Sequence, residues 1–157
     1  MEHKRLSHLL IGAGAAACAG LAVLFLLYAP VLGLEVRDMM PEYAFLFWPA
    51  LLYVWAIGGI YMAAMWQYMR ISLRIGQDNS FCAENAQSLR VIGYLLLAGA
   101  GMWALLMIAA VAVKAGPAAL VLLLAAMASG ALGVLAYAIG LLVQRAAQLQ
   151  EENELTI

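Results

Sequence analysis

The residues of this sequence that could carry out chemistry are few. His3 and His8 are five residues apart, a spacing that does not place both on one helix face. Glu151 and Glu152 form a carboxylate pair in a polar segment, where no apolar shell would tune them for acid–base work. No H-E-x-x-H or Walker loop and no recognisable Ser-His-Asp constellation occurs. We therefore expect no enzyme, no metal site and no cofactor; haem ligation by His8 and a methionine is the open alternative, although Met in apolar helices usually serves packing.

Three short features resemble known motifs. The segment GAGAAA from Gly12 to Ala17 matches a dinucleotide fingerprint, but it lies inside an apolar run with no strand before it, so a helix contact is favoured. The AAAC segment ending at Cys18 resembles a lipoprotein cleavage box, but the apolar run continues beyond it, which favours an uncleaved membrane anchor. Cys82 lies near an expected helix N-terminus, where a thiol can become reactive, so redox or palmitoylation chemistry stays open.

The elements that position these residues are membrane-spanning helices. Of the 157 residues, 67% are hydrophobic and 11% are charged, too few charges to coat a water-soluble domain. Four long runs contain no Asp, Glu, Lys or Arg, and each exceeds the roughly 20 residues that span a bilayer. The sequence predicts an all-α, integral membrane four-helix antiparallel bundle forming one domain over residues 1–157. Its helices are expected at about 8–34, 43–70, 81–114 and 117–150, with an acidic tail at 151–157.

The distribution of Lys and Arg predicts the orientation. One side would hold six basic residues, namely Lys4, Arg5, Arg70, Arg74, Arg90 and Arg145. The other side would hold Arg37 and Lys114 only. Because basic residues are retained on the cytoplasmic side, both termini and the central loop are expected in the cytosol, in a bacterial inner membrane.

Small residues at four-residue spacing mark expected contact faces between helices. The first helix carries Gly12, Ala16 and Gly20, and the fourth carries Ala125, Ser129 and Gly133. These faces are expected to close a compact bundle; packing of one face against a second copy is the alternative. Ser129 is expected to bond its own helix backbone. The glycine pairs 58–59 and 99–101 are expected to interrupt the second and third helices.

The segment DNSFCAENAQSLRVIGY, from Asp78 to Tyr94, is one of the few stretches of the chain with several polar residues in a row. Asp78, Asn79 and Ser80 are good N-cap residues, so a helix is expected to start near Phe81 and to extend about two turns into the cytosol before entering the membrane. Its polar face would hold Glu84, Gln87 and Arg90. A well-capped helix start with no further role is the alternative to a docking surface.

The C-terminal segment is acidic and faces the same compartment in this topology. It contributes Glu151, Glu152 and Glu154. Together with the polar segment it defines an expected partner-binding set: Asp78, Glu84, Gln87, Arg90, Glu151, Glu152 and Glu154. A frayed terminus is the alternative.

FCAENAQSLRVIGY from Phe81 and LQEENELTI from Leu149 resemble domain-of-unknown-function family 2975, a bacterial group of small four-helix membrane proteins. The resemblance rests on the tail and on six residues: Phe81, Asn85, Leu89, Arg90, Gly93 and Tyr94. Members of this family are often encoded beside a small helix-turn-helix DNA-binding protein. The resemblance therefore implies regulatory pairing at the membrane.

We accordingly expect a non-enzymatic membrane regulator that binds a cytosolic helix-turn-helix transcription factor. Membrane lipid is a further expected partner, a homo-oligomer is possible by the packing argument above, and direct nucleic-acid binding is not expected. The alternative is a transporter-like protein that binds a small molecule or lipid in a cavity between its helices. That cavity would be lined by four aromatic residues: Tyr53, Trp55, Tyr61 and Trp103.

Overall fold

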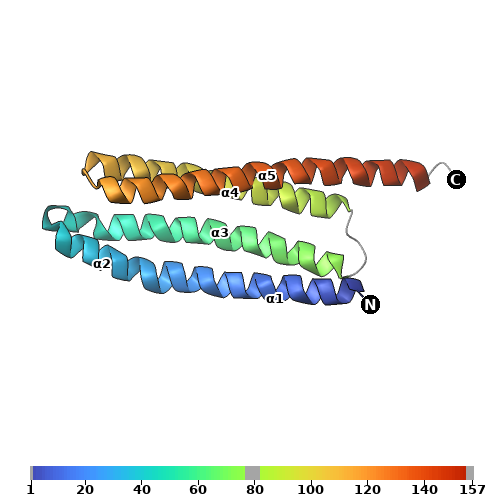
Figure 1. Ribbon diagram of the computed structural model, residues 1–157, viewed down its shortest axis with the longest axis horizontal. Helices are drawn as coiled ribbons and strands as arrows, with labels where there is room; N and C mark the ends of the chain where they lie inside the picture. Colours follow the sequence, from blue (N-terminus) through green and yellow to red (C-terminus); the bar gives the residue numbers. More distant parts are fainter. Residues whose placement is uncertain (1, 77–81, 155–157) are drawn as a thin grey trace.

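The computed structural model describes residues 2–76 and 82–154, with side chains for 7–76 and 82–152. Its elements are α1 (Glu2–Val23), the π-helix η1 (Leu24–Tyr28), α2 (Ala29–Met39), the 3₁₀-helix η2 (Pro41–Leu46), α3 (Phe47–Ile75), α4 (Ala83–Ala112) and α5 (Gly116–Glu154). Four helical spans are long and apolar enough to cross a membrane, with η1 and η2 each part of a span. The predicted all-α fold with four helices able to cross a membrane is confirmed for the described residues, and Figure 1 shows the spans running side by side.

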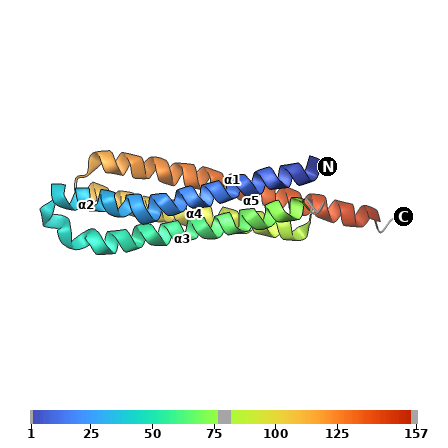
Figure 2. The same cartoon turned by 90° about the horizontal axis from the view of Figure 1, so that it is seen from below.

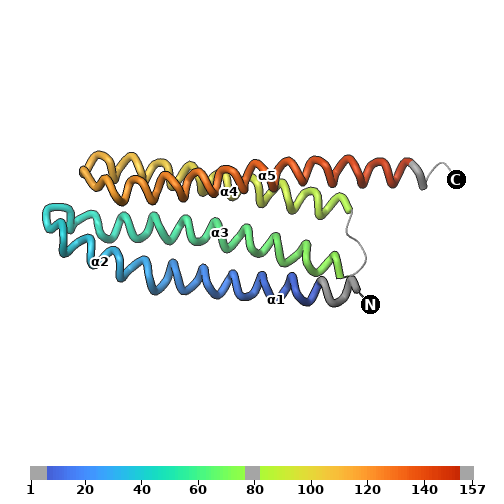
Figure 3. Tube along the Cα trace, in the orientation of Figure 1, coloured from blue at the N-terminus to red at the C-terminus, as the bar shows by residue number. Residues whose placement is uncertain are grey.

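The first span is one continuous helical segment from Glu2 to Met39, longer than predicted. The coloured part of its trace in Figure 3 runs without a break. Its π-helical turn has a local cause in Pro30, which lacks an N–H and crowds the carbonyl four residues earlier. The Ala29 N–H donates five residues back to Leu24 O, so the carbonyl of Phe25 loses its usual helical partner. Trp55 Nε1 of α3 donates to that Phe25 oxygen at 2.8 Å. A proline inside the apolar run thus creates an acceptor that ties the first span to α3.

Two turns, one between α2 and α3 and one between α4 and α5, lie at the prolines and glycines that the sequence places there. Pro41 opens η2, and Pro49 lies in the first turn of α3, where a missing N–H costs little. Between α4 and α5, Lys114 adopts a left-handed backbone with φ 60°, and Pro117 follows in the first turn of α5.

The helices form an open row in the order α1, α3, α4, α5, and α4 and α5 pack most closely. Among the described residues, α1 and α5 have no close backbone approach that would close the row into a bundle. Figure 1 shows α1, α3 and the α4–α5 pair in this order, and Figures 1 and 2 both place the two ends of the described chain at one end of the molecule. The expected compact bundle is therefore wrong in this respect. In each span, at most 17% of an apolar stretch of 18 residues is buried by the chain itself, which leaves apolar surface for lipid or another copy.

The α4–α5 contact depends on glycines that let the two backbones approach. A Cβ added at Gly93 would lie 2.9 Å from Gly133 O and from Tyr137 N. One added at Gly133 would lie 3.0 Å from Leu97 N, and one at Gly140 would lie 3.1 Å from Ala86 O. Of the predicted α5 stripe, Ser129 and Gly133 are buried and Ala125 is half-buried. This stripe is a contact face within the chain, and Gly140 extends it.

The matching stripe of α1 has no such contact. Gly12, Ala16 and Gly20 are exposed, and a Cβ added at either glycine would meet nothing within 4 Å. The contact glycine of α1 is Gly14, where a Cβ would meet the Tyr68 ring at 2.9 Å. The prediction that this stripe packs against another helix of the same copy is therefore wrong. The reason is that α1 turns a different face to α3.

Glycines 58, 59, 99 and 101 do not interrupt α3 or α4, contrary to prediction. Gly58 and Gly99 are close-approach positions instead, under the rings of Phe25 and Tyr61 respectively. A Cβ placed at Gly59 or at Gly101 would have no neighbouring atom within 4 Å.

A chain of hydrogen bonds crosses three helices at mid-span. Trp103 Nε1 donates to Tyr61 Oη at 2.8 Å, and Tyr61 Oη donates to Ser129 Oγ at 2.9 Å. Ser129 Oγ donates to Leu96 O on α4 at 2.7 Å. Ser129 therefore bonds a neighbouring helix and not its own backbone, because α4 lies close enough to compete.

Candidate polar site between the end of α3 and the start of α4

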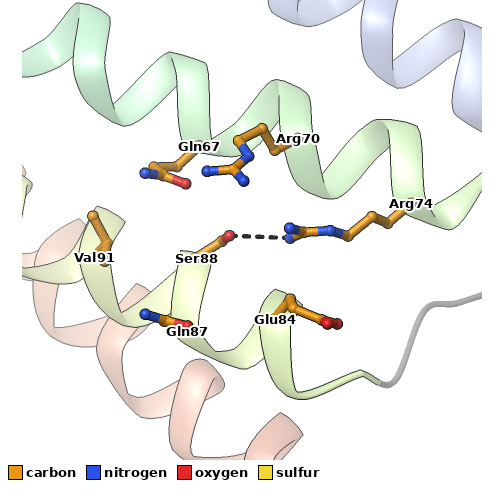
Figure 4. A pocket seen from close by; sticks show the side chains of 7 residues that line it. All are labelled: Gln67, Arg70, Arg74, Glu84, Gln87, Ser88 and Val91. Atoms are coloured by element: carbon orange, nitrogen blue, oxygen red, sulfur yellow. Dashed lines mark hydrogen bonds between the residues drawn. The ribbon is translucent and has the colours of Figure 1, made fainter.

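Polar side chains gather where α3 ends and α4 begins, around a cavity of about 220 Å³ (Figure 4). Three lining residues come from α3 and four from α4, in the order Gln67, Arg70, Arg74, Glu84, Gln87, Ser88 and Val91. Gln67, Arg70 and Arg74 share a helix face because their spacing is three and four residues. The antiparallel packing of α3 and α4 places the first turns of α4 opposite that face.

Arg74 is held in place by two neutral acceptors on α4. Its Nη1 donates to Asn85 Oδ1 and to Ser88 Oγ, both at 3.3 Å. Asn85 is 1% exposed and Ser88 is 5% exposed, so these acceptors are fixed by their surroundings. Because neither acceptor is charged, the bonds orient the guanidinium without neutralising it.

The charge of the site is positive. Arg70 is exposed and forms no hydrogen bond or ion pair with a described side chain, and Figure 4 shows its guanidinium beside Gln67, over the cavity. Glu84 is the single carboxylate in the lining, and it forms no ion pair with either arginine in the described structure. Figure 4 shows its carboxylate directed away from Arg70 and Gln67. The carboxylate lies on the Arg74 side. A hydrogen bond with the Cys82 side chain lowers the pKa of Glu84, and the charge of Arg74 contributes to this lowering. Two guanidinium groups still outnumber one carboxylate, so the site suits an anion.

A second set of polar contacts anchors α1 to this end of α3. Ser7 Oγ donates to Ser72 O at 2.9 Å, and Ser72 Oγ donates to Tyr68 O at 3.0 Å. Tyr68 Oη in turn donates to Leu10 O at 3.2 Å. The α3 segment that carries Arg70 and Arg74 is thus braced on its α1 side, which limits how far the site can deform.

The predicted cap residues Asp78, Asn79 and Ser80 lie outside the described residues, as does Phe81. The N-cap position of α4 belongs to Cys82, which has an extended backbone and no side-chain cap bond. Its carbonyl accepts from the Asn85 and Ala86 amides at 3.1 and 3.2 Å, as an N-cap carbonyl does. The helix thus begins two residues later than predicted, and its N-cap residue is none of the three that were named.

The expected polar face of α4 is only partly formed. Glu84 and Gln87 are exposed and line the cavity. Arg90 does not join them: its Cγ lies 2.9 Å from a Cβ built at Gly140, and its Nε is buried without a hydrogen-bond partner. Arg90 thus packs against α5, because the glycine there leaves room for its aliphatic stem.

The acidic end of α5 projects past the rest of the molecule (Figure 1). Gly140 lies level with Ala86 and Arg90, so the start of α4 is level with about Arg145. From there to Glu154 the helix continues for about 13 Å at 1.5 Å per residue. Glu151 and Glu152 are exposed on this projection; the side chain of Glu154 lies outside those described.

The four aromatic residues expected to line a transport cavity make hydrogen bonds between helices. Tyr53 Oη donates to Met102 O at 2.9 Å, and Trp55, Tyr61 and Trp103 make the bonds described above. None of the four lines the polar cavity. Within the described side chains, no group of three His, Cys, Asp or Glu residues is placed to hold a metal ion.

Sequence reasoning missed Arg70, Arg74, Asn85 and Ser88 as members of a site. The available signal was the paired spacing: two arginines four apart at the end of one helix, and Asn85 and Ser88 three apart at the start of the next. What the sequence did not show was that these two faces meet.

Comparisons with curated proteins and with solved structures give no match. A family model does match, and it extends from residue 31 to residue 157. This range holds most of α2 and all of α3, α4 and α5, and therefore the whole polar site, while α1 and η1 precede it. The chain belongs to the family described as protein of unknown function (DUF2975).

Proposed function

We propose that this chain is a non-enzymatic membrane regulator that binds a soluble cytosolic protein at the end of the molecule where α4 begins and α5 projects. The observation that carries the proposal is the projection of α5. It presents exposed Glu151 and Glu152 beyond the start of α4, at the end where exposed Glu84 and Gln87 lie. A helix with exposed carboxylates outside the apolar spans is a surface that a soluble protein can reach.

The Lys and Arg bias of the connecting segments supports a cytosolic location for this end, in a bacterial inner membrane. The family resemblance supports a small helix-turn-helix DNA-binding protein as the partner. Such a protein carries a basic surface for phosphate contacts, and carboxylates on α5 complement that charge. The partner would then be held at the membrane or released, while the membrane protein itself contacts no nucleic acid.

Transport through the row of helices has less support. The four aromatic residues expected to line a pathway use their polar atoms in bonds between helices.

The test is co-purification of the membrane protein with a small helix-turn-helix protein of the kind that the family resemblance implies as its partner. Deletion of Glu151–Ile157 combined with Glu84→Gln is expected to weaken retention of the partner about tenfold, since several charge-assisted contacts are lost. Arg90 is left unchanged because it packs against α5. Glu35→Gln, an exposed carboxylate at the opposite end, is the matched control. Equal retention by the double variant and the control would refute the proposal.

A further inference from the structure

We propose that the cavity between α3 and α4 binds the phosphate of an anionic phospholipid headgroup, with Arg70 and Arg74 as its ligands. Its two ligands do not belong to the partner surface, although Glu84 and Gln87 of that surface also line the cavity, and the inference does not depend on partner binding.

The level of the cavity along the helices points to lipid. Arg70 is the first charged residue after the charge-free stretch from Tyr43 to Met69, and Val91 begins the charge-free stretch of α4. The cavity therefore lies where the apolar parts of both helices end, at the depth of the lipid headgroups. Trp66, one residue before Gln67, is 66% exposed, as expected of an indole at the membrane interface.

The chemistry of the lining fits a phosphate. Arg74 is oriented by Asn85 and Ser88 but keeps its charge, and Arg70 is unpaired among the described residues. Guanidinium groups bind phosphate oxygens through paired N–H donors, and basic pockets between membrane helices suit anionic headgroups. The carboxamides of Gln67 and Gln87 can add donors. Glu84 opposes an anion, but its carboxylate is directed away from Arg70 (Figure 4).

The dimensions also fit. About 220 Å³ is several times the roughly 30 Å³ that one water molecule takes up, so a phosphate with its ester oxygens can enter. Val91 supplies an apolar wall on the deeper side, toward the acyl chains. A soluble anion would use the same two arginines but would gain nothing from this depth.

Native mass spectrometry of the full chain in neutral detergent tests the proposal, with phosphatidylglycerol, phosphatidylcholine or inorganic phosphate as the added probe. We expect phosphatidylglycerol to bind at least tenfold more tightly than phosphatidylcholine. Arg70→Gln should weaken phosphatidylglycerol binding about tenfold, because one charge-assisted contact is lost. Arg145→Gln, another exposed arginine, is the matched control and should bind within about twofold of the wild type.

Arg70 forms no hydrogen bond or ion pair with the described residues, so the Arg70→Gln variant is expected to fold. Circular dichroism checks that it does. Arg74→Lys keeps the charge but loses the planar donor pair, and it should weaken binding less than Arg70→Gln. Equal effects of the Arg70 and Arg145 substitutions would overturn the site. Displacement of phosphatidylglycerol by inorganic phosphate at the same concentration would overturn the assignment to lipid.

Discussion

Two stripes of small residues with the same four-residue spacing have opposite environments in this molecule. Ser129 and Gly133 of α5 are buried against α4, where backbone meets backbone. Gly12, Ala16 and Gly20 of α1 lie on an outer face. The difference shows that such spacing marks a helix face that allows close approach, whereas the neighbouring helix decides whether the approach happens. In α5 the neighbour is α4, joined by a short turn; α1 contacts α3 through aromatic side chains on another face.

The largest test of this comparison is Gly93→Ala. The added methyl would lie 2.8 Å from Tyr137 Cβ and 2.9 Å from Gly133 O, and backbone cannot move aside as a side chain can. We expect the free energy of unfolding in mixed micelles to fall by about 2 kcal/mol, as overpacking does. Gly101→Ala on the same helix, with no atom near its Cβ, is the control and should change it by less than about 0.5 kcal/mol. If both variants lost the same free energy of unfolding, the close packing of α4 on α5 would not be what stabilises this helix pair.

The second test removes the hydrogen bonds that join α3 to α4 and α5. Tyr61→Phe deprives Trp103 Nε1 of its acceptor and Ser129 Oγ of a donor. The expected loss is about 1 kcal/mol, since single bonds between membrane helices contribute modestly. Tyr28→Phe serves as the control because Tyr28 is 54% exposed. Thermal unfolding of both variants in detergent gives the comparison, and an equally stable Tyr61→Phe protein would show that the chain of bonds contributes nothing.

The third test lies within α1, where no effect larger than that of Tyr61→Phe is expected. A methyl at Gly14 would meet Tyr68 Cε1 at 2.9 Å, but a tyrosine ring can shift, so Gly14→Ala should cost about 1 kcal/mol, at the low end for overpacking. Gly12→Ala, two residues away on the outer face, is expected to leave unfolding unchanged within about 0.5 kcal/mol. Chemical unfolding of the two variants separates the faces of the helix; a greater loss at Gly12 would reverse the assignment.

The four long helices could be predicted from the sequence because charge-free runs of membrane length are a strong signal. The sequence could not predict which helices are neighbours or which faces they turn to one another. Nothing in the spacing of Gly12 and Gly20 shows that α1 turns another face to α3, and nothing at Ser129 shows that Leu96 O is within reach. Such contacts depend on helix rotation and on which helices are neighbours, which composition does not encode.

The candidate site was predicted in part for the same reason. Glu84 and Gln87 were expected on an exposed face of α4 and lie there. Arg90, three residues after Gln87, packs against α5 instead, because Gly140 opens a space that only the structure reveals. Arg70 and Arg74 were read as signs of orientation alone, although their four-residue spacing already placed them on one face.

The π-helical turn at Leu24–Tyr28 changes the angular phase of the first span. It accommodates one more residue than an α-helical turn, so every later side chain is rotated by about 100° relative to an uninterrupted helix. This rotation directs Gly33 toward α3, where an added Cβ would lie 3.0 Å from the Phe47 ring. The residues before the turn and those after it therefore present different faces to α3 at the same helical phase. A periodicity calculated across the whole span averages these two faces. Deleting one residue from the turn would restore a uniform helical period and leave Gly33 facing Phe47, because the deletion removes the extra residue that the turn accommodates.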